Sequence, residues 1–72
     1  MQKRDQLTNN DHDKMDAFIG AIIDDYKNGL VSKQAIIAGL GHVIGAIDHG
    51  NHDEARMWFS QGRKFIREKL ND

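Results

Sequence analysis

Hydrophobic residues recur at helical spacing in the first third of the chain. They fall at i, i+3, i+4, i+7, i+8 and i+11, which places them on one side of a helix of about 3.6 residues per turn. Aspartates gather where this segment begins, and a helix N-terminus favours negative charge. Gly29 follows the segment, and glycine commonly ends a helix in a left-handed conformation. The pattern predicts a helix over about 11–28 whose buried side holds Met15, Phe18, Ile19, Ile22, Ile23 and Tyr26.

A second apolar stripe follows a short polar turn. Ser32 stands just before it, and a serine hydroxyl can accept a hydrogen bond from the free amides of a first helical turn. Gly50 stands just after it, in the position of a helix-ending glycine. The pattern predicts a helix over about 33–49 whose buried side holds Ile36, Ile37, Leu40, Val43, Ile44 and Ile47.

The third stripe begins after Asn51. Asn51 with Glu54 three residues later resembles a capping box, in which asparagine replaces the usual serine or threonine. Acidic residues lie at the start of the segment and basic residues near its end, as the helix dipole prefers. The pattern predicts a helix over about 52–70 whose buried side holds Ala55, Trp58, Phe59, Gly62, Phe65, Ile66 and Leu70.

Three helices joined by short glycine-containing turns predict an all-α fold, a small three-helix bundle. The chain has 72 residues and no proline, and its first residues are polar without periodicity. We therefore expect a flexible N-terminal tail over 1–9 and one domain over 10–72. A domain this small has a marginal hydrophobic core, and such scaffolds often gain stability from disulfides, metals or self-association. The chain has no cysteine, which excludes disulfides and thiolate metal sites.

The predicted middle helix has an unusual second side. Between Lys33 and Asp48 it carries no charged residue when histidine is neutral, and small residues stand opposite the aliphatic stripe. Glycine inside a helix costs about 1 kcal/mol of stability relative to alanine. Gly39, Gly41 and Gly45 therefore need a contact that offsets this loss of stability. Three interpretations are open: a second copy or partner protein packs closely there, another helix of the same chain does, or the glycines have no packing role. We predict an interface formed by Ala38, Gly41, His42, Gly45 and His49.

Basic residues form a stripe along the predicted third helix, opposite its aromatic side. The stripe consists of Arg56, Arg63 and Arg67, with Lys64 further round the helix. It could bind phosphates or an acidic protein surface, or it could be an ordinary solvated helix face. The formal net charge of −1 argues against binding dominated by nucleic-acid phosphates, because such domains tend to be basic.

Histidines and carboxylates lie close together between Asp48 and Glu54, but no recognised zinc spacing is present. We expect helix capping there, and therefore no metal and no cofactor. Ser32 is the expected cap and no phosphate-binding glycine loop is present, so we expect no enzymatic activity.

No apolar run approaches the ~20 residues of a membrane span, and the absence of cysteine fits a reducing cytoplasm. The sequence carries no motif that assigns it to a known family. The expected function is a non-enzymatic interaction module, such as a regulator, inhibitor or adaptor, that forms a homodimer or binds a protein partner. The alternative is a nucleic-acid-binding regulator that uses the basic stripe.

Overall fold

Three α-helices and one π-helical turn make up the described part of the chain. The computed structural model describes residues 6–71. It contains α1 (Asn9–Lys27), α2 (Lys33–Asp48) and α3 (His52–Phe65), and α3 continues directly into the π-helical turn η1 (Ile66–Leu70). No strand occurs in this part of the chain. The predicted all-α three-helix fold is therefore confirmed, and the second and third helices have nearly the predicted bounds.

Helix α1 begins two residues earlier than predicted. The Thr8 hydroxyl accepts a hydrogen bond from the Asp11 backbone N–H at 3.1 Å, and the Asp11 carboxylate accepts from the Thr8 N–H at 2.9 Å. This reciprocal pair is a capping box. Leu7 also packs against the core, so the end of the predicted tail belongs to the folded domain. The rest of that tail, residues 1–5, lies outside the described residues.

The two turns use glycine as predicted. Gly29 and Gly50 both have a φ of 76°, in the left-handed region that side chains disfavour. The predicted caps also form: Ser32 accepts from the Ala35 N–H, and Asn51 accepts from the Glu54 N–H. These local signals fix where α1 and α2 end and where α2 and α3 begin.

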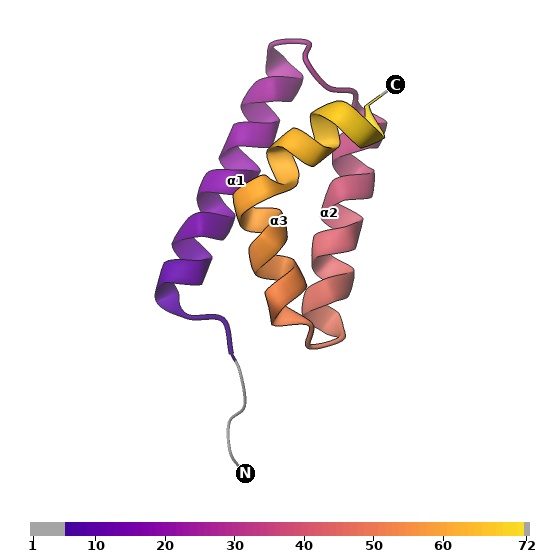
Figure 1. Cartoon of the computed structure of the whole chain (residues 1–72). Helices are drawn as coiled ribbons and strands as arrows, with labels where there is room; N and C mark the ends of the chain where they lie inside the picture. The colour runs from indigo at the N-terminus through magenta and orange to yellow at the C-terminus, as the bar shows by residue number, and fades with distance from the viewer. Residues whose placement is uncertain (1–5, 72) are drawn as a thin grey trace.

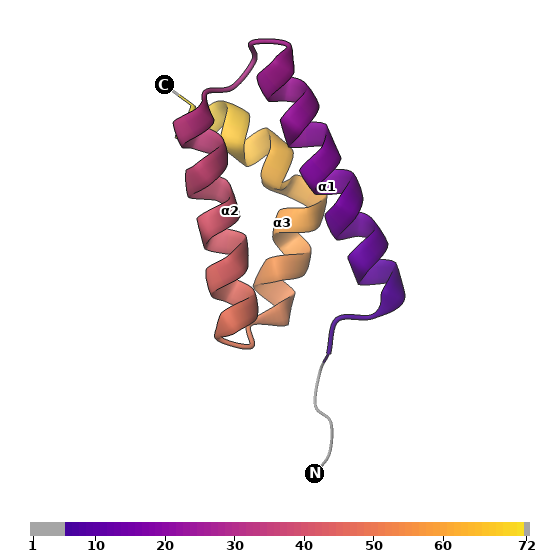
Figure 2. The ribbon, with the colours of Figure 1, turned by 180° about the vertical axis from the view of Figure 1, so that it is seen from behind.

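The helices run up, down and up, so α1 and α3 start at the same end of the molecule (Figure 1). Segment η1 bends away from α3 and brings the C-terminus beside the start of α2 (Figures 1 and 2). Asn71 fastens this end: its side-chain carbonyl accepts from the Ser32 N–H at 2.8 Å, and its amide donates to the Leu30 carbonyl at 3.1 Å. The C-terminal segment therefore closes the bundle over the α1–α2 turn.

The core lies where α3 and η1 pack against α1 and α2. Trp58 and Phe59 are buried at its centre, and Phe18 contacts Phe59 with ring centroids 6.4 Å apart. Helix α2 contributes mainly small residues to this core. The buried residues of α2 are Ala35, Gly39, Val43 and Ala46.

The predicted buried side of α2 is wrong for two isoleucines. Ile37 is 59% exposed and Ile44 is 64% exposed, while the other predicted aliphatics except Val43 are only half-buried. The bulky side chains of α3 and η1 explain the difference. A Cβ atom on Gly39 would lie 2.5 Å from the Ile66 Cδ1 atom, so only a small residue fits there. Helix α2 therefore turns a third side inward, made of Ala35, Gly39, Val43 and Ala46, and leaves part of its aliphatic stripe exposed.

Three further residues predicted to be buried are also partly exposed. Ile23 and Tyr26 of α1 and Phe65 of α3 each keep more than two-fifths of their surface in contact with solvent. Phe65 nevertheless contacts the edge of Trp58, with ring centroids 5.2 Å apart. Together with Ile37 and Ile44, these residues show that the bundle leaves much apolar surface uncovered.

Candidate interaction surface

Helix α2 presents an uncharged surface to solvent. Ile37 and Ile44 lie on it with Gly41 between them, and only polar or small residues occupy the remaining exposed positions. Solvent-facing sides of helices usually carry Lys, Glu or Arg. Exposed isoleucines separated by glycine are therefore unusual on a free surface. The exposed residues between the charged ends of α2 are Gln34, Ile37, Ala38, Gly41, His42 and Ile44, with Gly45 half-buried beside them and His49 exposed just after the helix.

The predicted interface glycines face open space. A Cβ atom on Gly41 or Gly45 would meet no atom within 4 Å. The interpretation that another helix of the same chain packs on them is therefore wrong. Close approach within the chain occurs instead at Gly39, against Ile66, and at Gly62, against Trp58 and Phe18. Ala38, the third small residue of the predicted interface, is exposed.

The predicted interface histidines lie on a different side of α2 from the isoleucines. The His42 ring stacks on Trp58, with centroids 5.5 Å apart and an interplanar angle of 10°. His49 lines a shallow groove between the end of α2 and the start of α3, which also includes Asn51 and Glu54. Gly41 and Gly45 line the same groove as the two histidines, so four of the five predicted interface residues border it, and Gly41 lies between this groove and the isoleucines.

An apolar groove between α1 and α2 adjoins the isoleucine side. Ile23 and Tyr26 of α1 form one wall, and Ile36 and Ile37 form the other with Lys33. The sequence pattern had assigned all four apolar side chains to the core. One signal could have revealed the groove, because six aliphatics spread over an arc of roughly 120° on α2 are more than one neighbouring helix can cover.

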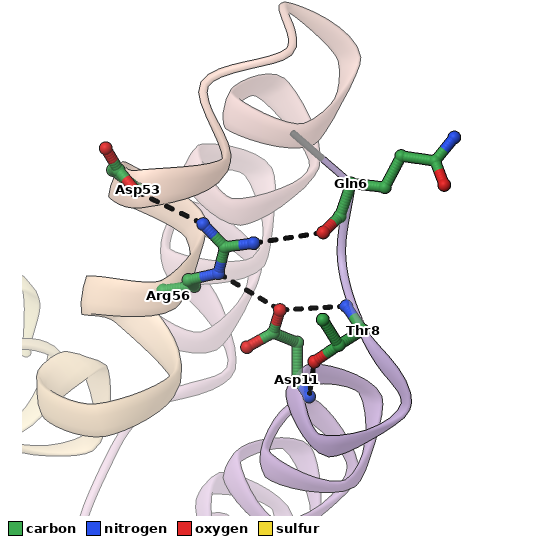
Figure 3. A network of polar contacts seen from close by, with 5 residues as sticks. All are labelled: Gln6, Thr8, Asp11, Asp53 and Arg56. Carbon is green, nitrogen blue, oxygen red and sulfur yellow. Dashed lines mark hydrogen bonds and ion pairs between the residues drawn. The ribbon is translucent and has the colours of Figure 1, made fainter. Parts of the chain in front are cut away.

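The basic stripe of α3 is largely engaged with α1. Arg56 Nε donates to the Asp11 carboxylate at 3.0 Å, and the same guanidinium reaches Asp53 and the Gln6 carbonyl (Figure 3). The Asp11 oxygen that accepts from Arg56 also accepts from the Thr8 N–H. Arg56 therefore joins the start of α1 to the start of α3.

Arg63 forms the second connection between these helices. Its guanidinium binds the Asp25 carboxylate through two hydrogen bonds of 2.9 and 2.8 Å. Asp25 has no exposed side-chain surface, and Arg67 Nε lies 3.9 Å from the same carboxylate. Bidentate arginine–carboxylate pairs are strong and geometrically specific. The arginines predicted to meet a partner thus meet buried carboxylates of their own chain.

Lys64 and Arg67 remain on the exposed side of this region. Both line an open depression with Ser60, Arg63 and Glu68. Glu68 lowers the positive charge of this depression, and Arg63 and Arg67 also lie beside the Asp25 carboxylate, which leaves Lys64 as the basic residue not directed at Asp25.

The burial of Asp11 and Asp25 was not predicted from the sequence, although their spacing indicates it. Asp11, Met15, Phe18, Ile22 and Asp25 are separated alternately by four and three residues, so they form one stripe along α1. Two aspartates at the ends of an apolar stripe need positive partners on the facing helix. Arg56 and Arg63, seven residues apart on α3, supply them.

These ion pairs alter the ionisation of the groups they join. The hydrogen bonds from Arg63 lower the pKa of Asp25, against an opposing effect of burial. The Thr8 backbone N–H and then Arg56 lower the pKa of Asp11, again against burial. The same Asp25 contact raises the pKa of Arg63. Both aspartates are therefore held in the charged form in the folded protein.

We expect the fold to lose stability in acid. Because both aspartates have a lower pKa folded than unfolded, their stabilising effect is complete above the ordinary value of 3.8 and disappears as the pH falls through the folded values. Urea denaturation at pH values from about 7 to about 3 measures this effect. The variant Asp25→Asn should be less stable at neutral pH and lose less stability on acidification. A parallel decline in both proteins would contradict the role of Asp25.

Comparisons with protein-family models, curated proteins and solved structures gave no match to this chain. In residues 6–71, no helix combines the length and apolar character needed to cross a membrane. The same residues contain no group of three His, Asp or Glu side chains placed to hold a metal ion.

Proposed function

We propose that this chain is a small protein–protein interaction module that self-associates through the exposed side of α2. Such a module acts as a regulator, inhibitor or adaptor rather than as an enzyme. The observation that supports the proposal most is the pair of exposed isoleucines, Ile37 and Ile44, on a helix surface without charges. Exposed apolar surface that continues over several side chains is typical of interaction sites.

The energetics favour covering this surface. Complete burial of an isoleucine contributes about 1.5–3 kcal/mol, so covering Ile37 and Ile44, each more than half exposed, contributes about 1–2 kcal/mol apiece. Association must also offset the loss of translational and rotational freedom. The neighbouring apolar groove, with Ile23, Tyr26 and Ile36, adds further apolar surface that a partner can cover.

Gly41 suits close packing between helices. It lies between Ile37 and Ile44 on the exposed side, and nothing in the chain occupies the space beside it. A facing helix can approach closely at a glycine and place its own large side chains there. Self-association supplies such a helix, because the same surface carries both the glycine and the large side chains.

We expect Ile44→Lys to abolish or strongly weaken self-association. The substitution places a charge at the most exposed isoleucine, where a covering helix would have to desolvate it. Sedimentation or light scattering over a concentration series measures the effect. Met57→Lys is the matched control, because Met57 is 47% exposed but lies on α3.

Two results would count against this proposal. The unmodified protein could stay monomeric at every concentration tested, which would remove self-association. Alternatively, Met57→Lys and Ile44→Lys could weaken association equally, which would show that another surface is used. Circular dichroism should show the same helical content in both variants, so that unfolding is not mistaken for dissociation.

The proposal does not include nucleic-acid binding, because Arg56 and Arg63 are bound to carboxylates of α1. It assigns no catalytic role: the Ser32 hydroxyl caps α2, and the Ser60 hydroxyl donates to the Met57 carbonyl. A cytoplasmic location, expected from the lack of cysteine, is also part of the proposal.

A further inference from the structure

We infer that the partner of this surface is a second copy of the chain, bound so that the two α2 helices run antiparallel about a two-fold axis near Leu40 and Gly41. The inference rests on the proposed function and specifies the orientation of the self-association.

A single exposed line of residues runs the length of α2. Lys33, Ile37, Gly41, Ile44 and Asp48 stand at i, i+4, i+8, i+11 and i+15, a spacing that keeps them on one side of a helix. All five are exposed in the structure. The line spans about 22 Å at the helical rise per residue. It therefore consists of a positive end, two isoleucines with a glycine between them, and a negative end.

This line is complementary to itself when reversed. A two-fold axis at its midpoint, between Leu40 and Gly41, brings Lys33 opposite Asp48 of the second copy. The same axis brings Ile37 opposite Ile44 of the second copy. A parallel arrangement would instead place Lys33 beside Lys33 and Asp48 beside Asp48, and facing like charges oppose association. The charges therefore select the antiparallel arrangement.

The charges at the ends of α2 are the reverse of what a single helix favours. A helix N-terminus prefers acidic residues and a C-terminus prefers basic ones. Lys33 is the first residue of α2 and Asp48 is the last, and neither forms an ion pair within residues 6–71. Antiparallel pairing offsets both unfavourable interactions with the helix dipole. Lys33 then lies near Asp48 and the negative C-terminal end of the second α2, and Asp48 lies near Lys33 and the positive N-terminal end of the second α2.

The apolar groove between α1 and α2 is placed to receive part of the second copy. Lys33 and Ile37 both line this groove, and they are the residues that face Asp48 and Ile44 of the second copy. The Ile44 side chain, the most exposed of the large apolar ones, can therefore settle between Ile37 and the α1 wall formed by Ile23 and Tyr26. Symmetry provides the same contact twice.

The antiparallel orientation can be tested by reversing the charge of Lys33 or of Asp48 and then mixing the two variants. In Lys33→Glu alone, or in Asp48→Lys alone, both end contacts of an antiparallel dimer become repulsive. We expect each single variant to dimerise about tenfold more weakly than the unmodified chain at low ionic strength, where surface charges are least screened. In an equimolar mixture of the two variants, the glutamate introduced in the first faces the lysine introduced in the second. The other end of that mixed dimer retains the native Lys33–Asp48 contact, so the mixture should recover the original affinity.

Measuring the folding stability of each variant distinguishes a weakened interface from a destabilised monomer. Each single reversal improves the match between charge and helix dipole, so each monomer should be at least as stable as the unmodified chain. Weaker dimerisation of a more stable monomer therefore reports on the interface. Asp16→Lys, an exposed reversal on α1, is the matched control and should leave the dissociation constant unchanged.

The outcomes distinguish this inference from the proposed function. If the chain dimerises and Ile44→Lys disrupts the dimer, but the reversals and their mixture bind like the unmodified chain, the antiparallel orientation is wrong. A parallel dimer would also contradict it. Each single reversal would then bind like the unmodified chain, because it only replaces one like-charge contact with another, and the mixture would bind more tightly, because both ends of the mixed dimer would pair opposite charges. If the unmodified chain never dimerises, the proposed self-association fails as well.

Discussion

Arg63→Met is expected to remove most of the stability of the fold, leaving about 0–2 kcal/mol. The substitution removes both hydrogen bonds to Asp25, whose side chain is completely buried. A buried carboxylate without its partner costs on the order of 3 kcal/mol. A domain of this size has a total stability of only about 3–5 kcal/mol. Urea denaturation followed by circular dichroism measures the loss.

A double variant distinguishes the effect of leaving the Asp25 charge unpaired from the effect of losing the packing of the Arg63 side chain. Arg63→Met with Asp25→Leu removes both members of the pair, and an apolar replacement of both is often nearly neutral. We expect the double variant to recover most of the stability that Arg63→Met alone loses. Equal destabilisation of the single and double variants would show that Arg63 stabilises the bundle by some means other than Asp25.

Gly62→Ala is expected to destabilise the bundle, although alanine is the better helix former. A Cβ atom at this position would lie 2.6 Å from Trp58 Cε3 and 2.7 Å from Phe18 Cε1. Both atoms belong to rigid rings, Trp58 one turn earlier on α3 and Phe18 on α1, so relief requires the buried Trp58 ring to shift and α1 to move away from α3. Overpacking of this kind costs about 1–3 kcal/mol, which exceeds the ~1 kcal/mol gain in helix propensity. Thermal denaturation should show a lower midpoint.

The other glycines provide controls for this prediction. A Cβ atom on Gly20 or Gly41 would meet nothing within 4 Å, so alanine at either position should stabilise the monomer by ~1 kcal/mol. Gly39→Ala should be intermediate, because the nearest atom belongs to the flexible end of Ile66. Stabilisation by Gly62→Ala comparable to that by Gly20→Ala would show that α1 and α3 separate at little cost. Gly41→Ala should also weaken self-association, whereas Gly20→Ala should not.

The amino-acid sequence determined the number of helices, their order and most of their ends. Ser32, Asn51, Gly29 and Gly50 act on backbone groups only a few residues away, so their effect can be read without knowing the fold. The start of α1 was misplaced because several polar residues near Asp11 could cap a helix. The structure selects Thr8, whose capping box with Asp11 is reinforced by Arg56 from α3.

Only the tertiary structure decided which side of each helix is buried. Periodicity shows that α2 has an aliphatic side and an opposite small side, but α3 and η1 contact a third side between them, with Ala35, Gly39 and Ala46. The large residues Trp58 and Ile66 require a small facing side, and so Gly39 is buried while Ile37 and Ile44 face solvent. The partnership of Asp25 with Arg63 likewise depends on how α1 and α3 are placed. Local hydrogen bonding specifies elements along the chain, whereas the fit between side chains distant in sequence specifies surfaces.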